Sequence, residues 1–366
     1  MEELLIKKIE ELSSQMIEDI KTIVRIDSVK SEEEPEAPFG KGVKLALDTT
    51  LKICERLGFQ TKNIDNYIGY AQYGDGDDYV CAIGHLDVVP VGEGWKHPPF
   101  SAYEEDGYIY SRGILDNKGP IMTCLYALYA IKELQLKLDK PIRIIFGCDE
   151  ESGFNDLEYY LFKEKPPIMG FTPDCKFPVV YGERGRAETE IRNSDKSIDN
   201  FFKMVNTYFM NAKANGERLG LDYCDQEFGM SEIRNYELKH VDDQLIFSFA
   251  LSYPSGMNID EAVLKIREKT SMEVEVVHHF LPVKFDKDCF MVKQMQYAYE
   301  KITGNDGTPV TTTGGTYAKL MPHIVPFGPS FPGQKGIGHQ PNEWMSIEDL
   351  ITNAKIYALA LYSLAK

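Results

Sequence analysis

Short apolar runs alternate with helical patterns along most of this chain, and this alternation constrains its fold more than any other feature. Residues 79–83 and 142–146 are apolar runs of strand length. Residues 1–26 and 121–134 carry apolar side chains at helical spacing. Strands that alternate with helices in this way predict an α/β fold, with a mixed sheet flanked by helices and parallel strands within it.

The pattern changes over residues 184–285. The segment ERGRAETEIRNSDKSIDN, residues 183–200, is polar and rich in turn-forming residues, which predicts a domain boundary. The segments after it predict helices at 201–214 and 260–269 and strands at 244–253 and 271–280. We therefore expect a small α+β lid domain at 184–285, inserted into a discontinuous domain of residues 1–183 and 286–366.

Composition excludes several classes of partner. The 366 residues include 57 acidic and 40 basic side chains, and the net charge of −17 argues against nucleic acid and anionic membranes. No run of about 18 apolar residues predicts a membrane span, and the N-terminal segment does not resemble a signal peptide. Seven cysteines without a CxxC pair predict reduced thiols and a cytoplasmic location.

Polar clusters follow the predicted strands, where α/β proteins place their ligands. These clusters contain His85, Asp87, Asp116, Asn117, Asp149, Glu150, Glu151, Asp174 and His339. Imidazoles and carboxylates are the ligand set that suits Zn²⁺, Mn²⁺ or Co²⁺. Each pattern alone is also common in purely structural roles. Their joint placement predicts a site for two divalent ions, which would offset the mutual repulsion of the carboxylates.

Four segments of the chain resemble the motifs of a known family. They are GHLDVVPVGEGWKHPPFSAYEEDGYIYSRGILDNKGP, RIIFGCDEESG, GFTPDCKFPVVYGERG and GHQPNE. The chain resembles the di-zinc aminoacylase, carnosinase and PepV-type dipeptidase metallopeptidases over residues 1–183 and 286–366. The resemblance implies a zinc-exopeptidase-like fold with an inserted lid.

The resemblance also implies a role for each site residue. His85 and Asp174 would bind one zinc ion, Glu151 and His339 the other, and Asp116 both. Glu150 would be the general base, acting with a hydroxide that bridges the ions, and Asp87 would orient His85. The implied activity is hydrolysis of the amide bond in a dipeptide or similar small substrate. Manganese and cobalt are alternatives to zinc, and both a monomer and a homodimer are compatible with the sequence.

The lid departs from the family pattern. The resembled dipeptidases are roughly a hundred residues longer, and the shortfall falls at residues 189–197, where an engineered junction at 193–196 is one explanation. Segments that would supply an asparagine for the substrate and a histidine for the oxyanion are absent. Ala250 and Ser252 replace an asparagine and an arginine, and Lys319 replaces another arginine.

These departures leave two alternatives to the dipeptidase. One is a metal-binding homologue with little or no peptidase activity. The other is an N-acyl amino acid deacylase or amidase whose substrate lacks the usual carboxylate. The candidates to replace the missing lid histidine are His240, His278 and His279. For His278 and His279, a solvent-facing position at the end of an edge strand is the favoured interpretation.

Overall fold

The computed structural model describes residues 1–193 and 196–366, so part of the predicted junction at 193–196 lies outside the described residues. Its contacts divide the chain into two units. The first comprises Met1–Val180, Asp286–Val310 and Thr316–Lys366, and the second comprises Tyr181–Phe285 and Thr311–Gly315.

The contacts group Thr311–Gly315 with the second unit, whereas the sequence places this segment in the domain of residues 1–183 and 286–366. It packs on the second unit because the backbone N–H of Arg184 donates to the carbonyl of Thr312 at 3.2 Å. Arg234 Nη2 also donates to the carbonyl of Thr313 at 2.9 Å.

A six-stranded sheet forms the centre of the first unit, in the order β1-β2-β6-β3-β7-β18. Its strands are β1 (Gln60–Ile64), β2 (Ile68–Tyr73), β3 (Val80–His85), β6 (Ile142–Gly147), β7 (Met169–Thr172) and β18 (Ile324–Pro326). β6, β3, β7 and β18 run parallel to one another, whereas β1 and β2 are antiparallel to their neighbours. The predicted mixed α/β sheet is confirmed.

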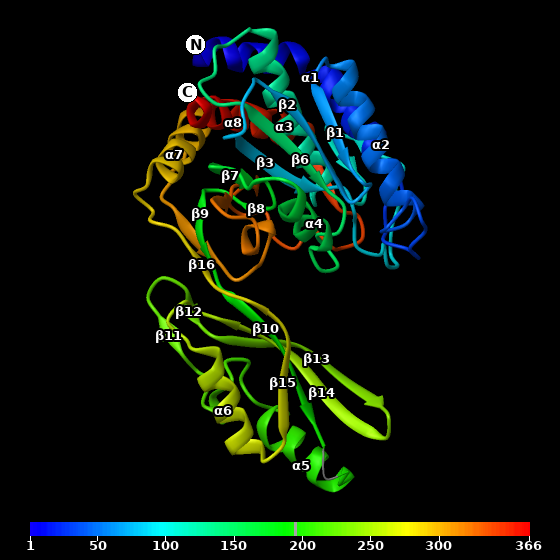
Figure 1. The fold of residues 1–366 in the computed structure, drawn as a ribbon, viewed down its shortest axis with the longest axis vertical. Coiled ribbons are helices and arrows are strands. Elements are labelled where there is room, and N and C mark those ends of the chain that lie inside the picture. Colours follow the sequence, from blue (N-terminus) through cyan, green and yellow to red (C-terminus); the bar gives the residue numbers. More distant parts are fainter. Residues whose placement is uncertain (194–195) are drawn as a thin grey trace. The chain divides into compact units, whose positions relative to one another are not determined.

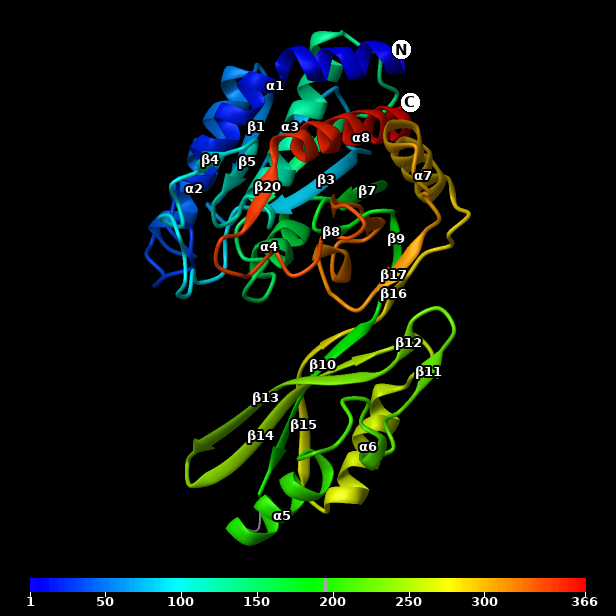
Figure 2. The ribbon, with the colours of Figure 1, turned by 180° about the vertical axis from the view of Figure 1, so that it is seen from behind.

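Helices cover both faces of this sheet (Figures 1 and 2). They are α1 (Glu2–Val24), α2 (Lys41–Arg56), α3 (Lys118–Glu133), α4 (Asn155–Lys163), α7 (Phe290–Thr303) and α8 (Ile347–Ala365). α3 packs closely on β3 at Gly84. A Cβ atom at this position would lie only 3.0 Å from the Cβ atom of Ile121. Every residue of β3 and β6 is buried, as expected for strands covered on both faces.

Shorter elements complete the chain. They are β4 (Tyr103–Glu105), β5 (Tyr108–Tyr110), β8 (Cys175–Lys176), β9 (Val180–Glu183), β16 (Val283–Lys284), β17 (Val310–Thr312), η2 (Tyr317–Lys319), β19 (Pro329–Ser330) and β20 (Trp344–Ser346). The final helix, α8, is capped at its N-terminus, since Ser346 Oγ accepts the N–H of Asp349 at 2.9 Å.

The second unit packs two helices on an antiparallel sheet in the order β13-β14-β10-β15. Its elements are β10 (Gly185–Arg192), α5 (Ile198–Tyr208), η1 (Glu217–Leu219), β11 (Cys224–Asp225), β12 (Gly229–Met230), β13 (Glu232–Val241), β14 (Gln244–Tyr253), α6 (Ile259–Thr270) and β15 (Glu273–Phe280). Reading residues 183–200 as polar turns was wrong for β10, which pairs with both β14 and β15.

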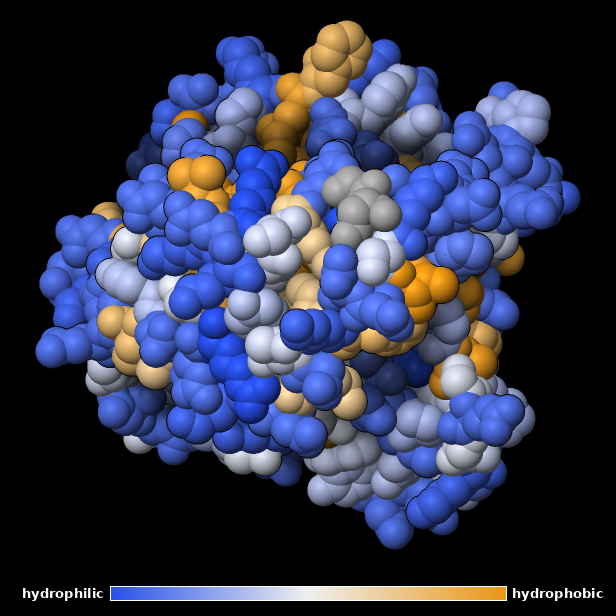
Figure 3. All heavy atoms as spheres, turned by 90° about the horizontal axis from the view of Figure 1, so that it is seen from below, coloured by the Kyte–Doolittle hydropathy of each residue, from blue (hydrophilic) through white to orange (hydrophobic). Residues whose placement is uncertain are grey.

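The surface agrees with the acidic, polar composition. The face shown in Figure 3 is mostly hydrophilic, with hydrophobic side chains in small separate groups. Within the described ranges, no helix combines the length and the apolar character needed to span a bilayer.

Candidate metal centre

His85 is the last residue of β3, and it is completely buried. Its Nδ1 atom lies 2.9 Å from the carbonyl oxygen of Asp87, which places Nε2 on the opposite side of the ring. Nε2 lies 3.1 Å from Asp116 Oδ1 and 3.6 Å from Asp174 Oδ2. The strand end therefore directs one imidazole nitrogen toward two carboxylates.

Asp116 lies between the two predicted histidines. One of its oxygens faces His85, and the other, Oδ2, lies 3.0 Å from Nε2 of His339. The same His339 nitrogen lies 3.0 Å from Glu151 Oε1. The structure therefore brings all five predicted ligands together, in two groups that share Asp116: His85, Asp116 and Asp174 in one, and Asp116, Glu151 and His339 in the other.

The donor spacing fits divalent ions. Within each group the ligand atoms lie within 4.8 Å of one another. A tetrahedral zinc ion with bonds of about 2.0–2.1 Å would separate its ligands by roughly 3.3 Å. The measured separations of 3.0–3.6 Å from the two histidine nitrogens are close to that value. The residues present could therefore hold two ions, with Asp116 contacting both.

The electrostatics also favour bound cations. Burial and the nearby Asp116 raise the pKa of Asp174 well above its ordinary range, and the same two causes raise the pKa of Glu151. Hydrogen bonds to Asp116 and Glu151 raise the pKa of His339 to about 11. The cluster therefore carries more negative charge than its imidazoles balance, which divalent ions would correct.

Glu150 belongs to neither group, but it interacts electrostatically with members of both, including Asp174 and Glu151. Burial, followed by the charge of Asp174, raises its pKa well above the usual range of a glutamate. Its backbone N–H donates to Asp87 Oδ1 at 3.2 Å, and the N–H of Glu151 donates to Asp87 Oδ2 at 3.1 Å. Asp87 therefore holds the loop after β6 in place.

The predicted bond from His85 to the carboxylate of Asp87 is longer than expected. Asp87 Oδ1 lies 3.4 Å from His85 Nδ1, whereas the carbonyl oxygen of Asp87 lies at 2.9 Å. The backbone of Asp87 is the nearer acceptor for the imidazole. Its carboxylate connects the ends of β3 and β6.

Glu343 is a residue of the centre that the sequence did not single out. It is buried, and its Oε1 atom accepts the backbone N–H groups of Gly113, Leu115 and Asp116 at 2.9–3.1 Å. Its Oε2 atom lies 2.7 Å from Nη1 of the buried Arg112. The available signal was its position at the end of GHQPNE, four residues after His339.

Asp156 is a second residue that holds the loop after β6, which contains Glu150. Asp156 Oδ2 accepts the N–H groups of Cys148 and Asp149 at 2.6 and 3.1 Å. The hydroxyl of Tyr317 also donates to it. This contact requires glycine at 147, because a Cβ atom there would lie 1.9 Å from the Tyr317 oxygen.

Of the positions that depart from the family pattern, Ala250 and Ser252 lie on β14 of the second unit, whereas Lys319 ends η2 of the first unit. Ser252 on β14 is opposite Arg186 on β10, and its Oγ atom is 3.4 Å from the carbonyl oxygen of Thr313. His279 is exposed, but its Nε2 atom lies 2.5 Å from the hydroxyl of Tyr253. His240 and His278 are exposed as well.

Comparison of the sequence with known families gives one match, over residues 81–363, to the model described as peptidase family M20/M25/M40. Putative dipeptidase YtjP of Bacillus subtilis is 29% identical over 451 aligned positions, covering 96% of this chain and 97% of that protein. Beta-Ala-Xaa dipeptidase of Lactobacillus delbrueckii is 28% identical over 455 positions, covering 96% of each. Both alignments exceed the 366 residues of this chain, so each relative contains segments without a counterpart here.

Solved structures share the fold. Human carnosine dipeptidase 1 superposes with a TM-score of 0.80 at 16% identity, covering 100% of this chain and 98% of that one. The dipeptidase Dug1p of Saccharomyces cerevisiae gives a TM-score of 0.77 at 14% identity, with the same coverage.

Proposed function

Because this chain belongs to peptidase family M20/M25/M40, we propose that it is a metal-dependent dipeptidase. The observation that carries the proposal is the pair of donor groups that share Asp116, with Glu150 beside them and part of neither. A site that only stored metal would not require an additional carboxylate at that place. The names of the relatives, which include several dipeptidases, support a dipeptide as the substrate.

In this proposal His85 and Asp174 hold one divalent ion, Glu151 and His339 hold the other, and Asp116 contacts both. The ions, zinc or alternatively manganese or cobalt, supply the Lewis acidity that makes water nucleophilic at neutral pH. Glu150 takes a proton from the attacking water and transfers it to the nitrogen of the leaving amine. Asp87 positions Glu150 through the backbone of the loop.

An amidase or deacylase acting on a substrate without a free carboxylate is the second candidate. Ser252 favours it, because this buried residue replaces the arginine that the family pattern would provide for a carboxylate. An amidase of this kind would cleave an N-acyl amino acid amide, which has no free carboxylate, whereas an N-acyl amino acid deacylase would cleave a substrate that keeps it. The dipeptidase would cleave a peptide with a free amino terminus.

The test is hydrolysis of a panel of dipeptides, N-acyl amino acids and N-acyl amino acid amides by protein from which metal has been removed and then restored as Zn²⁺, Mn²⁺ or Co²⁺. We expect turnover of unblocked dipeptides only after metal is restored. Turnover confined to the acylated substrates would replace the dipeptidase with the deacylase. Two bound ions without turnover of any substrate would favour the metal-binding homologue.

A further inference from the structure

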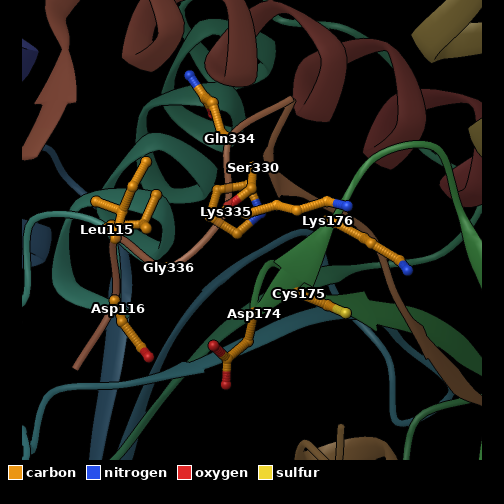
Figure 4. Close-up of a pocket in the computed structure, with 12 residues that line it drawn as sticks. Leu115, Asp116, Asp174, Cys175, Lys176, Ser330, Gln334, Lys335 and Gly336 are labelled. Atoms are coloured by element: carbon orange, nitrogen blue, oxygen red, sulfur yellow. The ribbon is translucent and has the colours of Figure 1, made fainter. Parts of the chain in front are cut away.

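A cavity of about 320 Å³ opens beside the candidate metal centre, within the first unit. Its walls include Asp116, Asp174, Lys176, Ser330, Gln334 and Lys335. Figure 4 shows the carboxylates of Asp116 and Asp174 at one side of this cavity and the ends of both lysine side chains at another. The cavity therefore connects one of the proposed metal groups to two ammonium groups.

Lys176 is held by a short parallel pair of strands. β8 and β19 align Lys176 with Ser330, and the N–H of Phe177 donates to the carbonyl of Ser330 at 2.7 Å. Lys176 follows Asp174 by two residues, and both side chains line the cavity. The backbone that positions a proposed ligand therefore also positions Lys176.

Lys335 follows a residue that fixes its loop. Gln334 Oε1 accepts the N–H of Phe331 at 2.9 Å, and Gln334 Nε2 donates to Asp349 Oδ2 at 2.8 Å. The second bond ties the loop to the first turn of α8. Lys335 is therefore attached to an anchored segment, although its own side chain is exposed.

Neither ammonium has a carboxylate partner within 4.0 Å among residues 1–193 and 196–366. Other lysines of this unit do pair, including Lys30 with Asp149 at 2.6 Å and Lys355 with Glu10 at 2.7 Å. Two ammonium groups without a carboxylate partner among the described residues therefore line one cavity in a chain with 57 acidic residues. Their combined potential favours an anion in the cavity.

We propose that Lys176 and Lys335 bind a carboxylate of the substrate while its scissile amide lies at the metal centre. The inference rests on the proposed function, since it assigns a recognition site to the same reaction. In a chain with a net charge of −17, two ammonium groups at one cavity attract a negatively charged group of the substrate. The carboxylate is either the C-terminal group of a dipeptide or an acidic side chain.

Matched substrate pairs distinguish the two sources. One pair is alanyl-leucine and its C-terminal amide, and the other is aspartyl-leucine and asparaginyl-leucine. We expect Lys176→Gln to lower kcat/KM for the carboxylate member of one pair by about 10-fold, mainly through KM, as for loss of a hydrogen bond to a charged group. For the member of that pair in which the carboxylate is replaced by an amide, kcat/KM should change by no more than about 2-fold. The pair that responds identifies the source.

Lys165→Gln is the matched control. It removes an exposed lysine of the same unit whose Nζ atom lies 3.8 Å from Asp77 Oδ2, and Lys165 does not line the cavity. Lys176→Arg keeps the charge and should retain most of the preference. An equal loss for both members of each pair, or no loss for any member, would overturn the proposal.

A binding measurement keeps this test independent of turnover. Calorimetric titration of each pair into metal-loaded Glu150→Gln and Glu150→Gln/Lys176→Gln, which should not turn the compounds over, should show weaker binding of the responding carboxylate member to the double variant. Equal affinities of both proteins for all four compounds would also overturn the proposal. Failure of the proposed function appears differently, as absence of hydrolysis of every dipeptide by the wild type with each metal.

Discussion

The carboxylate of Asp87 accepts the backbone N–H of Glu150 at 3.2 Å. This contact joins the loop after β3 to the loop after β6, and it acts on the residue proposed as the general base. Asp87 is buried, with 1% of its surface exposed, so the contact is shielded from competing water. A variant at Asp87 can therefore be tested separately for its effect on turnover and for its effect on metal content.

Asp87→Asn should lower kcat by about 10- to 100-fold, the usual effect of changing a residue that orients the groups of a metal site. The amide can accept only one of the two N–H groups from Glu150 and Glu151. We expect KM to change less than kcat, because the loop is displaced rather than the substrate pocket. Steady-state kinetics with metal content measured on the same samples checks this. An unchanged kcat would show that Asp87 does not position Glu150.

Glu343→Gln should destabilise the protein by about 3 kcal/mol, because Arg112 would be left buried without its ion-pair partner. Urea unfolding of the variant measures the loss. The double variant Arg112→Met/Glu343→Gln should be less destabilised than the sum of the single variants. Additive losses would mean that the two side chains are not coupled.

Stability should depend on pH through Asp156, whose pKa burial raises to about 7 from an ordinary value of 3.8. The folded state then binds this proton more tightly than the unfolded state. The stabilising contribution of Asp156 is therefore complete below the unfolded pKa and is lost as the pH rises through the folded pKa.

We expect the unfolding free energy of Asp156→Asn, relative to wild type, to increase between about pH 4 and about pH 7, because the variant lacks this proton. Urea unfolding at several pH values provides the comparison. A difference that stays constant over that interval would contradict the pKa shift.

The sequence could indicate several candidate ligands because they follow segments with a clear pattern. His85 ends a fully apolar run, and Glu150 and Glu151 follow another, so the parallel sheet brings them to one edge. The grouping of Asp116 with both histidines was implied by the family resemblance. Spacing along the chain alone could not place His339, which comes from a distant loop.

The sequence did not indicate the roles of Glu343, of β10 or of the two cavity lysines. Glu343 acts on backbone N–H groups more than two hundred positions away in sequence, so no local pattern indicates its role. The sequence indicates polar turns over β10 because four of its eight residues are charged. Its buried Ala187, Thr189 and Ile191 alternate with those residues and form the period of a strand with one polar face. Lys176 and Lys335 had no signal before the cavity was known.

The most direct test of the account is to measure metal content and turnover together in Glu150→Gln and His85→Ala. Both variants are purified, exposed to Zn²⁺ and dialysed, and bound metal is determined by plasma mass spectrometry beside dipeptide hydrolysis. We predict that Glu150→Gln retains the metal content of the wild type and loses at least about 100-fold in kcat, whereas His85→Ala loses metal as well. Loss of metal from Glu150→Gln to the same extent as from His85→Ala, or its full activity, would contradict the assignment of Glu150 as the unligated base.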